Sequence, residues 1–431
     1  MAAHETIVDR SSETSEPSVR LVFSGDCIIP EELSTPFVGE NIQARISTAD
    51  RAIVNLEAPI IETGSPIAKS GPVKVSAPDT APTLVGAGFD IATLANNHAM
   101  DYGEEGLNET LQSCAQAGLD TVGAGSSARA ATEPVLIKNK GISIAVLNLC
   151  EREFGIATGE KAGTAWVGQP DLASTIKEVT ETWDVVIAII HGGIEYVPFP
   201  PREVQRRHRN LIEQGIDLVV GHHPHVAQGW EQFQDGLIVY SLGNFFFNQS
   251  RPETQWGLLL DTTIQKDGVS TAEIIPIVAE DGMVSEMSRP ERQRYLRHLH
   301  RLSAITADRQ SLEAHWQAQA VHVFHRRYTE WLTKGVGALP RQFLSHPSHP
   351  VDLPARWTES ADQLVLLNLI RNESHRAVIQ TALEVQTGVV PDQRTANVEQ
   401  SFLEQLQWTD PPTDSERGLI RRGIRRLLQN V

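Results

Sequence analysis

At residues 219–225 the sequence reads Val219-Val220-Gly221-His222-His223-Pro224-His225, so three imidazoles follow an apolar run that starts near residue 215. The apolar run predicts a buried strand. A His-x-His pair that leaves a strand can direct both rings at one metal ion, and Pro224 fixes the backbone between them. The alternative is a solvated loop that is merely rich in histidine. Comparable polar clusters at other strand ends favour the metal site.

Short apolar runs alternate with amphipathic segments from residue 19 to about residue 277. The runs that predict strands are residues 19–23, 51–54, 89–94, 142–149, 185–190, 215–220 and 237–241. Segments 106–117 and 171–182 between them have helical spacing. This alternation predicts an α/β fold with a buried sheet, and such folds place their sites at strand ends.

The composition is that of a soluble globular protein, and it restricts the partners. The chain has 431 residues, of which 40% are hydrophobic and 21% charged, and its formal net charge is -17. This acidity argues against nucleic acid and against anionic lipid as partners. The three scattered cysteines fit a reduced compartment. With no apolar segment of membrane-spanning length and no signal sequence, we expect a cytoplasmic protein without a membrane partner.

Three regions are expected along the chain. Residues 1–18 are polar and predict a disordered tail, and residues 19–284 contain the α/β pattern and form the expected catalytic domain. Residues 285–431 predict a helical C-terminal region, with helices at 291–302, 309–332, 360–387 and 415–429. We expect this region to act as a lid or cap over the site, or as the surface of a homodimer.

The polar residues at the predicted strand ends form a mixed set of oxygen and nitrogen donors. Such a set suits a divalent cation. Each residue alone is a weak signal, because a single Asp after a strand is more often a helix cap or a turn former. The prediction depends on the whole set: Asp26, Glu57, Asn97, His98, Asp101, His191, His222, His223 and His225.

Six motifs in order resemble the CapA family, which is named for poly-γ-glutamate capsule synthesis. They are Gly25-Asp26, Asn55-Leu56-Glu57, Asn96-Asn97-His98-x-x-Asp101-Tyr102-Gly103, His191-Gly192-Gly193-x-Glu195-Tyr196, Gly221-His222-His223-Pro224-His225-Val226 and Tyr240-Ser241-Leu242-Gly243-Asn244-Phe245. The resemblance covers about residues 19–278. It implies the calcineurin-like metallophosphoesterase fold, which is a central β-sandwich flanked by helices.

The resemblance also implies a metal centre with a bridging carboxylate, and Glu57 stands at that position. Asn97, His191 and His223 match the other ligands of one ion, whereas Asp26 and His225 match ligands of a second ion. The family fold usually has His at the position of Ile28 and Gly-Asp-x-x-Asp where this chain has Asn55-Leu56-Glu57. The second site has therefore lost a ligand, which predicts one tightly bound manganese, calcium, zinc or iron ion and no organic cofactor.

Two His/Asp pairs are candidates for proton transfer. Asp26 and His225 are partly released from the depleted second site, and His98 and Asp101 follow one strand at a spacing of three. A carboxylate orients its imidazole and raises its basicity. The alternative for His98 and Asp101 is a structural hydrogen bond. We expect His222 to face outward or to contact substrate.

Several functions remain open. Some CapA-like proteins of lasso-peptide pathways are peptide epimerases, and two His/Asp pairs beside a metal suit inversion at a Cα of a ribosomal precursor peptide. Metal-assisted hydrolysis of a small phosphoester, or of another ester or amide, is the alternative. A capsule factor and a non-catalytic metal-stabilised binding protein are further alternatives.

Overall fold

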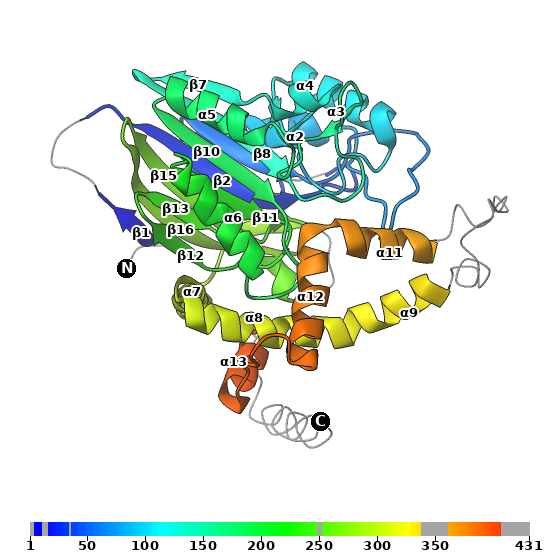
Figure 1. Ribbon diagram of the computed structural model, residues 1–431. Helices are drawn as coiled ribbons and strands as arrows, with labels where there is room; N and C mark the ends of the chain where they lie inside the picture. Colours follow the sequence, from blue (N-terminus) through cyan, green and yellow to red (C-terminus); the bar gives the residue numbers. More distant parts are fainter. Residues whose placement is uncertain (1–3, 11–15, 34–35, 248–251, 338–360, 407–431) are drawn as a thin grey trace.

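The computed structural model describes residues 4–10, 16–33, 36–247, 252–337 and 361–406. Two β-sheets face each other, helices cover their outer faces, and a separate set of helices lies along one side (Figure 1). The predicted fold class, a central β-sandwich flanked by helices with a helical C-terminal region, is confirmed.

The larger sheet contains parallel strands from its centre to one edge. β2 pairs in parallel with β3, β3 with β4, and β4 with β5. β14 adds in parallel to β2, and β17 adds to β16. The order in this sheet is β1 (Glu5–Asp9), β16 (Gly268–Glu280), β15 (Trp256–Gln265), β2 (Val19–Cys27), β3 (Arg51–Leu56), β4 (Ile91–Thr93) and β5 (Asp120–Val122), with β14 (Asn244–Phe246) and β17 (Met283–Glu286) beside them.

The second sheet also has a parallel centre, since β10 pairs in parallel with both β8 and β11. Its order is β12 (Trp230–Phe233), β13 (Gly236–Val239), β11 (Leu218–His222), β10 (Val185–His191), β8 (Ile142–Cys150) and β7 (Val135–Asn139). A short pair, β6 (Ala124–Gly125) and β9 (Gly163–Thr164), stands apart.

The period-two alternation of the strands builds the core. In β2, Leu21 and Phe23 pack between the two sheets, whereas Val22 packs against the outer helices. In β10, Ile187 faces the other sheet and Ala188 faces helices. Strands that are buried on both faces are apolar throughout, because water reaches neither side. The central parallel strands therefore appear in the sequence as continuous apolar runs.

Two groups of helices cover the outer faces. The larger sheet is covered by α1 (Glu40–Ser47), α2 (Thr80–Ala87) and α3 (Gly103–Ala117). The second sheet is covered by α5 (Leu172–Thr182) and α6 (Arg202–Glu213), and α4 (Ala128–Thr132) lies at the edge near β6. Each helix turns its apolar stripe inward, which is how amphipathic helices pack on sheets.

The C-terminal helices pack on one side of the sandwich. They are α7 (Arg289–Ala307), α8 (Arg309–Val323), α9 (Thr329–Gly337), α11 (Ala361–Arg371), α12 (Glu373–Thr387) and α13 (Ala396–Leu406), with a π-helical turn, Phe324–Tyr328, between α8 and α9. In Figure 1, α12 (orange) crosses from α11 to α8. The helix predicted at 360–387 is divided at Asn372, whose side chain caps α12. The helix predicted at 415–429 lies outside the described residues.

The prediction of a disordered tail over residues 1–18 is wrong for Glu5–Asp9. These residues form β1, an edge strand that pairs antiparallel with β16. The strand forms because Ile7 and Val8 are buried in the core between the sheets. Burial and pairing with β16 therefore outweigh the polar composition of this segment. Among the described residues, no helix has the length and apolarity needed to cross a membrane.

Candidate metal centre

The parallel strands of both sheets end at one edge of the sandwich, and the candidate residues lie there. Asp26 is near the end of β2 and Glu57 directly follows β3. His191 and His222 are the last residues of β10 and β11. Gly25 allows β2 and β14 to approach closely at this edge, since a Cβ there would lie 2.0 Å from the Gly243 carbonyl oxygen. The topology thus brings together residues that are far apart in the sequence.

The potential ligand atoms form two groups that share Glu57. Glu57, His191 and His223 form one group, and Asp26, Glu57 and His225 form the other, with all ligand atoms of a group within 4.8 Å of one another. Asn97 Oδ1 lies 3.1 Å from His191 Nε2, so it adds a fourth donor to the first group. The structure therefore gathers all six ligands predicted from the sequence, four around one position and three around the other.

Glu57 shows that a cation fits between these groups. Its side chain is completely buried, and neither carboxylate oxygen has a hydrogen-bond partner among the described residues. Burial and then the charge of Asp26 raise the pKa of Glu57 well above its ordinary value. A buried carboxylate without partners is costly unless a cation is bound to it. With imidazoles and an amide oxygen around it, the donor set suits a divalent transition metal.

Asp26 is the hydrogen-bonding centre of the second group. Asn55 Nδ2 donates to Asp26 Oδ1 at 2.8 Å, and His225 Nδ1 lies 3.3 Å from Oδ2. His222 Nδ1 lies 3.0 Å from Oδ1. Although burial opposes ionisation, the bonds to His222 and His225 hold the pKa of Asp26 well below its ordinary value. Asp26 is therefore a carboxylate fixed by several strands.

The prediction that His222 faces outward or contacts substrate is wrong. Its ring is buried and paired with Asp26, because His222 ends β11 with its side chain toward the other sheet. His223, the next residue, is in the first ligand group. His222 therefore belongs to the support of the metal centre.

The backbone at the histidine cluster is strained. His223 has φ = 98° and His225 has φ = 57°, which is left-handed backbone that residues with a side chain rarely adopt. Pro224 stands between them. Strain of this kind persists where the surrounding structure fixes it, and it is concentrated at functional sites. The turn places both rings, His223 toward one group and His225 toward the other, against Glu57.

The predicted pair of His98 and Asp101 is present, and it has a third member. His98 Nδ1 lies 2.7 Å from Asp101 Oδ2. The buried ammonium of Lys69 forms an ion pair with Asp101 Oδ1 and donates to the Asn97 carbonyl oxygen at 3.0 Å. Burial lowers the pKa of His98, whereas the Asp101 bond opposes that change. With Nδ1–H donating to Asp101, the lone pair of the neutral ring is on Nε2.

A cavity of about 250 Å³ adjoins the metal centre. Asn97, His98 and His223 line it from the sandwich side, and the helical C-terminal region lines it from the other side. Asp26 and His225 are not among its described lining residues, so of the two predicted His/Asp pairs only His98 lines this cavity.

The C-terminal region contributes an imidazole that the sequence interpretation missed. His375 on α12 lines the cavity, and its Nδ1 lies 2.5 Å from the Tyr328 hydroxyl oxygen. Burial raises the pKa of Tyr328, so its hydroxyl keeps its proton and donates it to Nδ1. The proton of the neutral His375 ring is therefore on Nε2, the reverse of the arrangement at His98.

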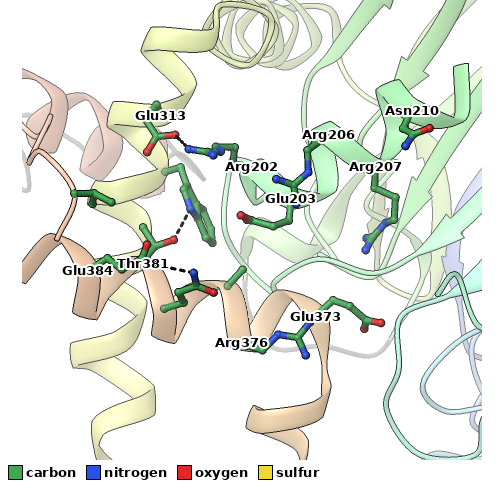
Figure 2. A pocket seen from close by; sticks show the side chains of 14 residues that line it. Arg202, Glu203, Arg206, Arg207, Asn210, Glu313, Glu373, Arg376, Thr381 and Glu384 are labelled. Atoms are coloured by element: carbon green, nitrogen blue, oxygen red, sulfur yellow. Dashed lines mark hydrogen bonds and ion pairs between the residues drawn. The ribbon is translucent and has the colours of Figure 1, made fainter. Parts of the chain in front are cut away.

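A second cleft, of about 710 Å³, lies between α6 and α12 (Figure 2). Its arginines and glutamates are equal in number, and some of them pair, as Arg202 does with Glu313 at 2.7 Å. Arg207 points from this cleft to Glu151, whose carboxylate also accepts from the Ser374 hydroxyl. The numbers of arginines and glutamates balance, so the lining does not indicate an anion site. The Ser374–Glu151 bond instead ties the start of α12 to the residue that follows β8.

Other supporting residues were also missed. Asn55 and Asn244 were visible only as parts of motifs, yet Asn55 bonds Asp26 and the Asn244 side-chain oxygen lies 2.9 Å from His225 Nδ1. Lys69 belongs to an irregular loop without periodicity. No local signal identifies such residues, since their partners come from distant strands.

The fold and the site define a two-sheet α/β protein with a candidate metal centre at its strand ends. Residues 20–249 match the family described as bacterial capsule synthesis protein PGA_cap. The match covers more than half of the chain, and the chain belongs to this family.

Two similar proteins are named as capsule or PGA biosynthesis proteins. The chain is 28% identical over 263 residues to a capsule biosynthesis protein CapA of Bacillus anthracis, covering 59% of this chain and 64% of the relative. It is 34% identical over 192 residues to a PGA biosynthesis protein CapA of Bacillus subtilis, covering 44% and 50%. The matched part of the chain thus spans between half and two thirds of these relatives.

Among solved structures, a putative 5'-nucleotidase from Staphylococcus aureus is similar with a TM-score of 0.39 and 13% identity. The alignment covers 65% of this chain and 58% of that one.

Proposed function

We propose that this chain is a metal-dependent acid–base enzyme whose substrate occupies the cavity beside Glu57 and His98. The observation that carries the proposal is the shared location: His98, oriented by Asp101, lines the same cavity as Asn97 and His223 of the metal centre. A base within reach of a cation is the combination that proton abstraction beside a carbonyl group requires.

Each part of the site has a role in this proposal. The shared Glu57 carboxylate and the surrounding imidazoles hold the ion, which when bound polarises a carbonyl or phosphoryl oxygen. His98 Nε2 accepts a proton, while Asp101 keeps the ring in the required tautomer. Lys69 fixes Asp101 and the backbone of Asn97.

The reaction that we favour is inversion at a peptide Cα. His98 Nε2 takes the proton as the Cα–H bond breaks, and the electron pair moves into the adjacent carbonyl group. A second group then returns a proton to the opposite face. His375, whose proton is on Nε2, lines the same cavity and replaces the Asp26–His225 pair in this role. As the Nε2 proton of His375 goes to the Cα, Nδ1 takes the proton of the Tyr328 hydroxyl. Solvent afterwards returns a proton to Tyr328 and removes the one on His98.

Two other candidates each have a supporting observation. The names of the CapA relatives support a role in poly-γ-glutamate capsule synthesis, in which the substrate is a glutamyl polymer. The two ligand groups that share Glu57 support metal-assisted hydrolysis of a phosphoester, since two-metal sites stabilise both oxygens of a displacement.

One set of assays separates these candidates. The manganese-loaded protein is incubated in D2O with N-acetylated peptide amides, with γ-linked glutamate oligomers and with an aryl phosphate. We expect deuterium at a peptide Cα, lost after chelation and in His98→Gln but kept in the matched control His300→Gln, whose ring is exposed. Phosphate release without deuterium uptake would contradict the acid–base proposal and favour the hydrolase.

A further inference from the structure

The cavity beside the metal centre has two chemically different sides. The sandwich side contributes Lys69, His98, Glu153, Glu195 and His223, which are ionisable. The opposite side is formed by α9, α11 and the start of α12: Trp331, Val365 and Leu369 are apolar, and His375 is the ionisable residue of this side. A substrate that fills this cavity therefore meets ionisable groups on the sandwich side and at His375, and an apolar surface on α9 and α11.

Asn368 is the polar residue that α11 contributes to the cavity wall, and its side-chain oxygen has no hydrogen-bond partner among the described residues. Its side chain is 7% exposed, it lines the cavity, and its Oδ1 is buried without a hydrogen bond among the described residues. Buried polar atoms are nearly always paired, and one that is not requires an explanation. An acceptor at a cavity wall is explained by a ligand that brings an N–H group.

No charged residue of α11 is among the described residues that line the cavity. Arg371, one turn further along, lies with its guanidinium 3.9 Å from the centre of the Phe154 ring, and it is not among the lining residues. Glu153 and Glu195 line the cavity and would repel a carboxylate side chain. The cavity thus suits a neutral, apolar residue better than a glutamyl one.

We propose that α11 selects the substrate, with Asn368 Oδ1 accepting a backbone N–H and with Val365, Leu369 and Trp331 holding an apolar side chain. The inference rests on the proposed function and names its substrate class, a peptide with an apolar residue at the reacting position. A cavity of about 250 Å³ is smaller than a site for a drug-sized ligand, so it takes one residue and its flanking peptide groups.

Calorimetry with small probes tests this assignment without turnover. The probes are N-acetyl-phenylalanine methylamide and two isosteres, each with one N–H replaced by CH2, titrated into the manganese-loaded full chain. We expect one isostere to bind wild type about fivefold more weakly, as one hydrogen bond would give. Asn368→Leu should bind that isostere and the parent equally, whereas Asn368→Asp, which keeps an acceptor, and the exposed control Asn108→Ala should keep the difference.

Other results would overturn the inference. An unchanged fivefold difference in Asn368→Leu excludes Asn368 as the acceptor, and circular dichroism checks that this variant is folded. If N-acetyl-glutamate methylamide binds as tightly as the phenylalanine probe, the apolar substrate class is excluded. The same conclusion follows if the wild-type protein does not bind the phenylalanine probe. An Asn368-dependent preference without metal-dependent deuterium uptake contradicts the proposed function and leaves this binding site in place.

Discussion

Oε1 of Glu57 lies 3.7 Å from His191 Nε2. The same oxygen lies 3.7 Å from Nε2 of His225, which belongs to the other ligand group. One buried carboxylate therefore faces imidazoles from β10 of the second sheet and from the turn after β11. This relationship makes Glu57 the residue on which both groups depend.

Glu57→Gln should remove more metal than any single histidine replacement. The amide cannot offer two anionic oxygens, so both groups lose their shared ligand. His191→Ala and His225→Ala each disrupt one group. Elemental analysis of protein purified in parallel measures the ratio of metal to chain. Equal metal content in Glu57→Gln and wild type would show that the carboxylate is not a ligand.

His98→Gln should keep its metal and lose turnover. His98 is not in either ligand group, and general acid–base catalysis by one side chain contributes roughly 10²–10⁴-fold. Metal content and deuterium uptake, measured on the same sample, check the two parts separately. Asp101→Asn should also keep its metal and lose turnover, because the His98 ring loses the carboxylate that accepts from Nδ1. Loss of metal in His98→Gln would instead assign this ring to the metal centre.

Lys69→Met should lower the free energy of unfolding by about 3 kcal/mol, because breaking a buried ion pair leaves an uncompensated charge. The Lys69 side chain is 2% exposed and its partner Asp101 is fully buried. Urea unfolding of the metal-free protein measures the change, with the exposed Lys177→Met as control. A change below about 0.5 kcal/mol, the range of ordinary surface substitutions, would contradict the buried pair.

His298 predicts acid sensitivity in the helical region. Burial lowers the pKa of this imidazole on α7 to about 3. Since the unfolded chain binds the proton near pH 6.5, His298 contributes stability that is complete above pH 6.5 and is lost as the pH falls toward 3. Between pH 7 and pH 5 this loss is about 2 kcal/mol. Urea unfolding at both values should show a smaller loss in His298→Gln than in wild type or His300→Gln. An equal loss of stability in all three proteins would contradict the assignment of this acid sensitivity to His298.

The parts of the fold that the sequence predicts are those with local physical signals. The runs 19–23 and 185–190 are apolar because their strands are buried on both faces, and both lie within strands. Of the run 215–220, residues 218–220 lie in a strand. The edge strand Glu5–Asp9 has no such signal, because only Ile7 and Val8 are buried and its pairing depends on β16. Composition therefore predicted disorder where tertiary pairing made a strand.

The candidate site shows the same limit. The six predicted ligands meet because each lies at or shortly after the end of an apolar strand, and parallel strands end at one edge. Lys69 and His375 come from a loop and from α12, and only the packing of distant segments brings them to the cavity. His222 was misjudged because its partner Asp26 lies on a strand of the other sheet, 196 residues away in the sequence, so no local signal shows the pairing.

The most direct test of the shared metal centre is anomalous diffraction from crystals soaked in Mn²⁺. We predict an anomalous peak within about 2.0–2.2 Å of a Glu57 carboxylate oxygen, the distance range of carboxylate–metal bonds. The peak should be bordered by His191 and His223, with any second peak beside Asp26 and His225. A fully soaked crystal with no anomalous peak next to Glu57 would contradict the account.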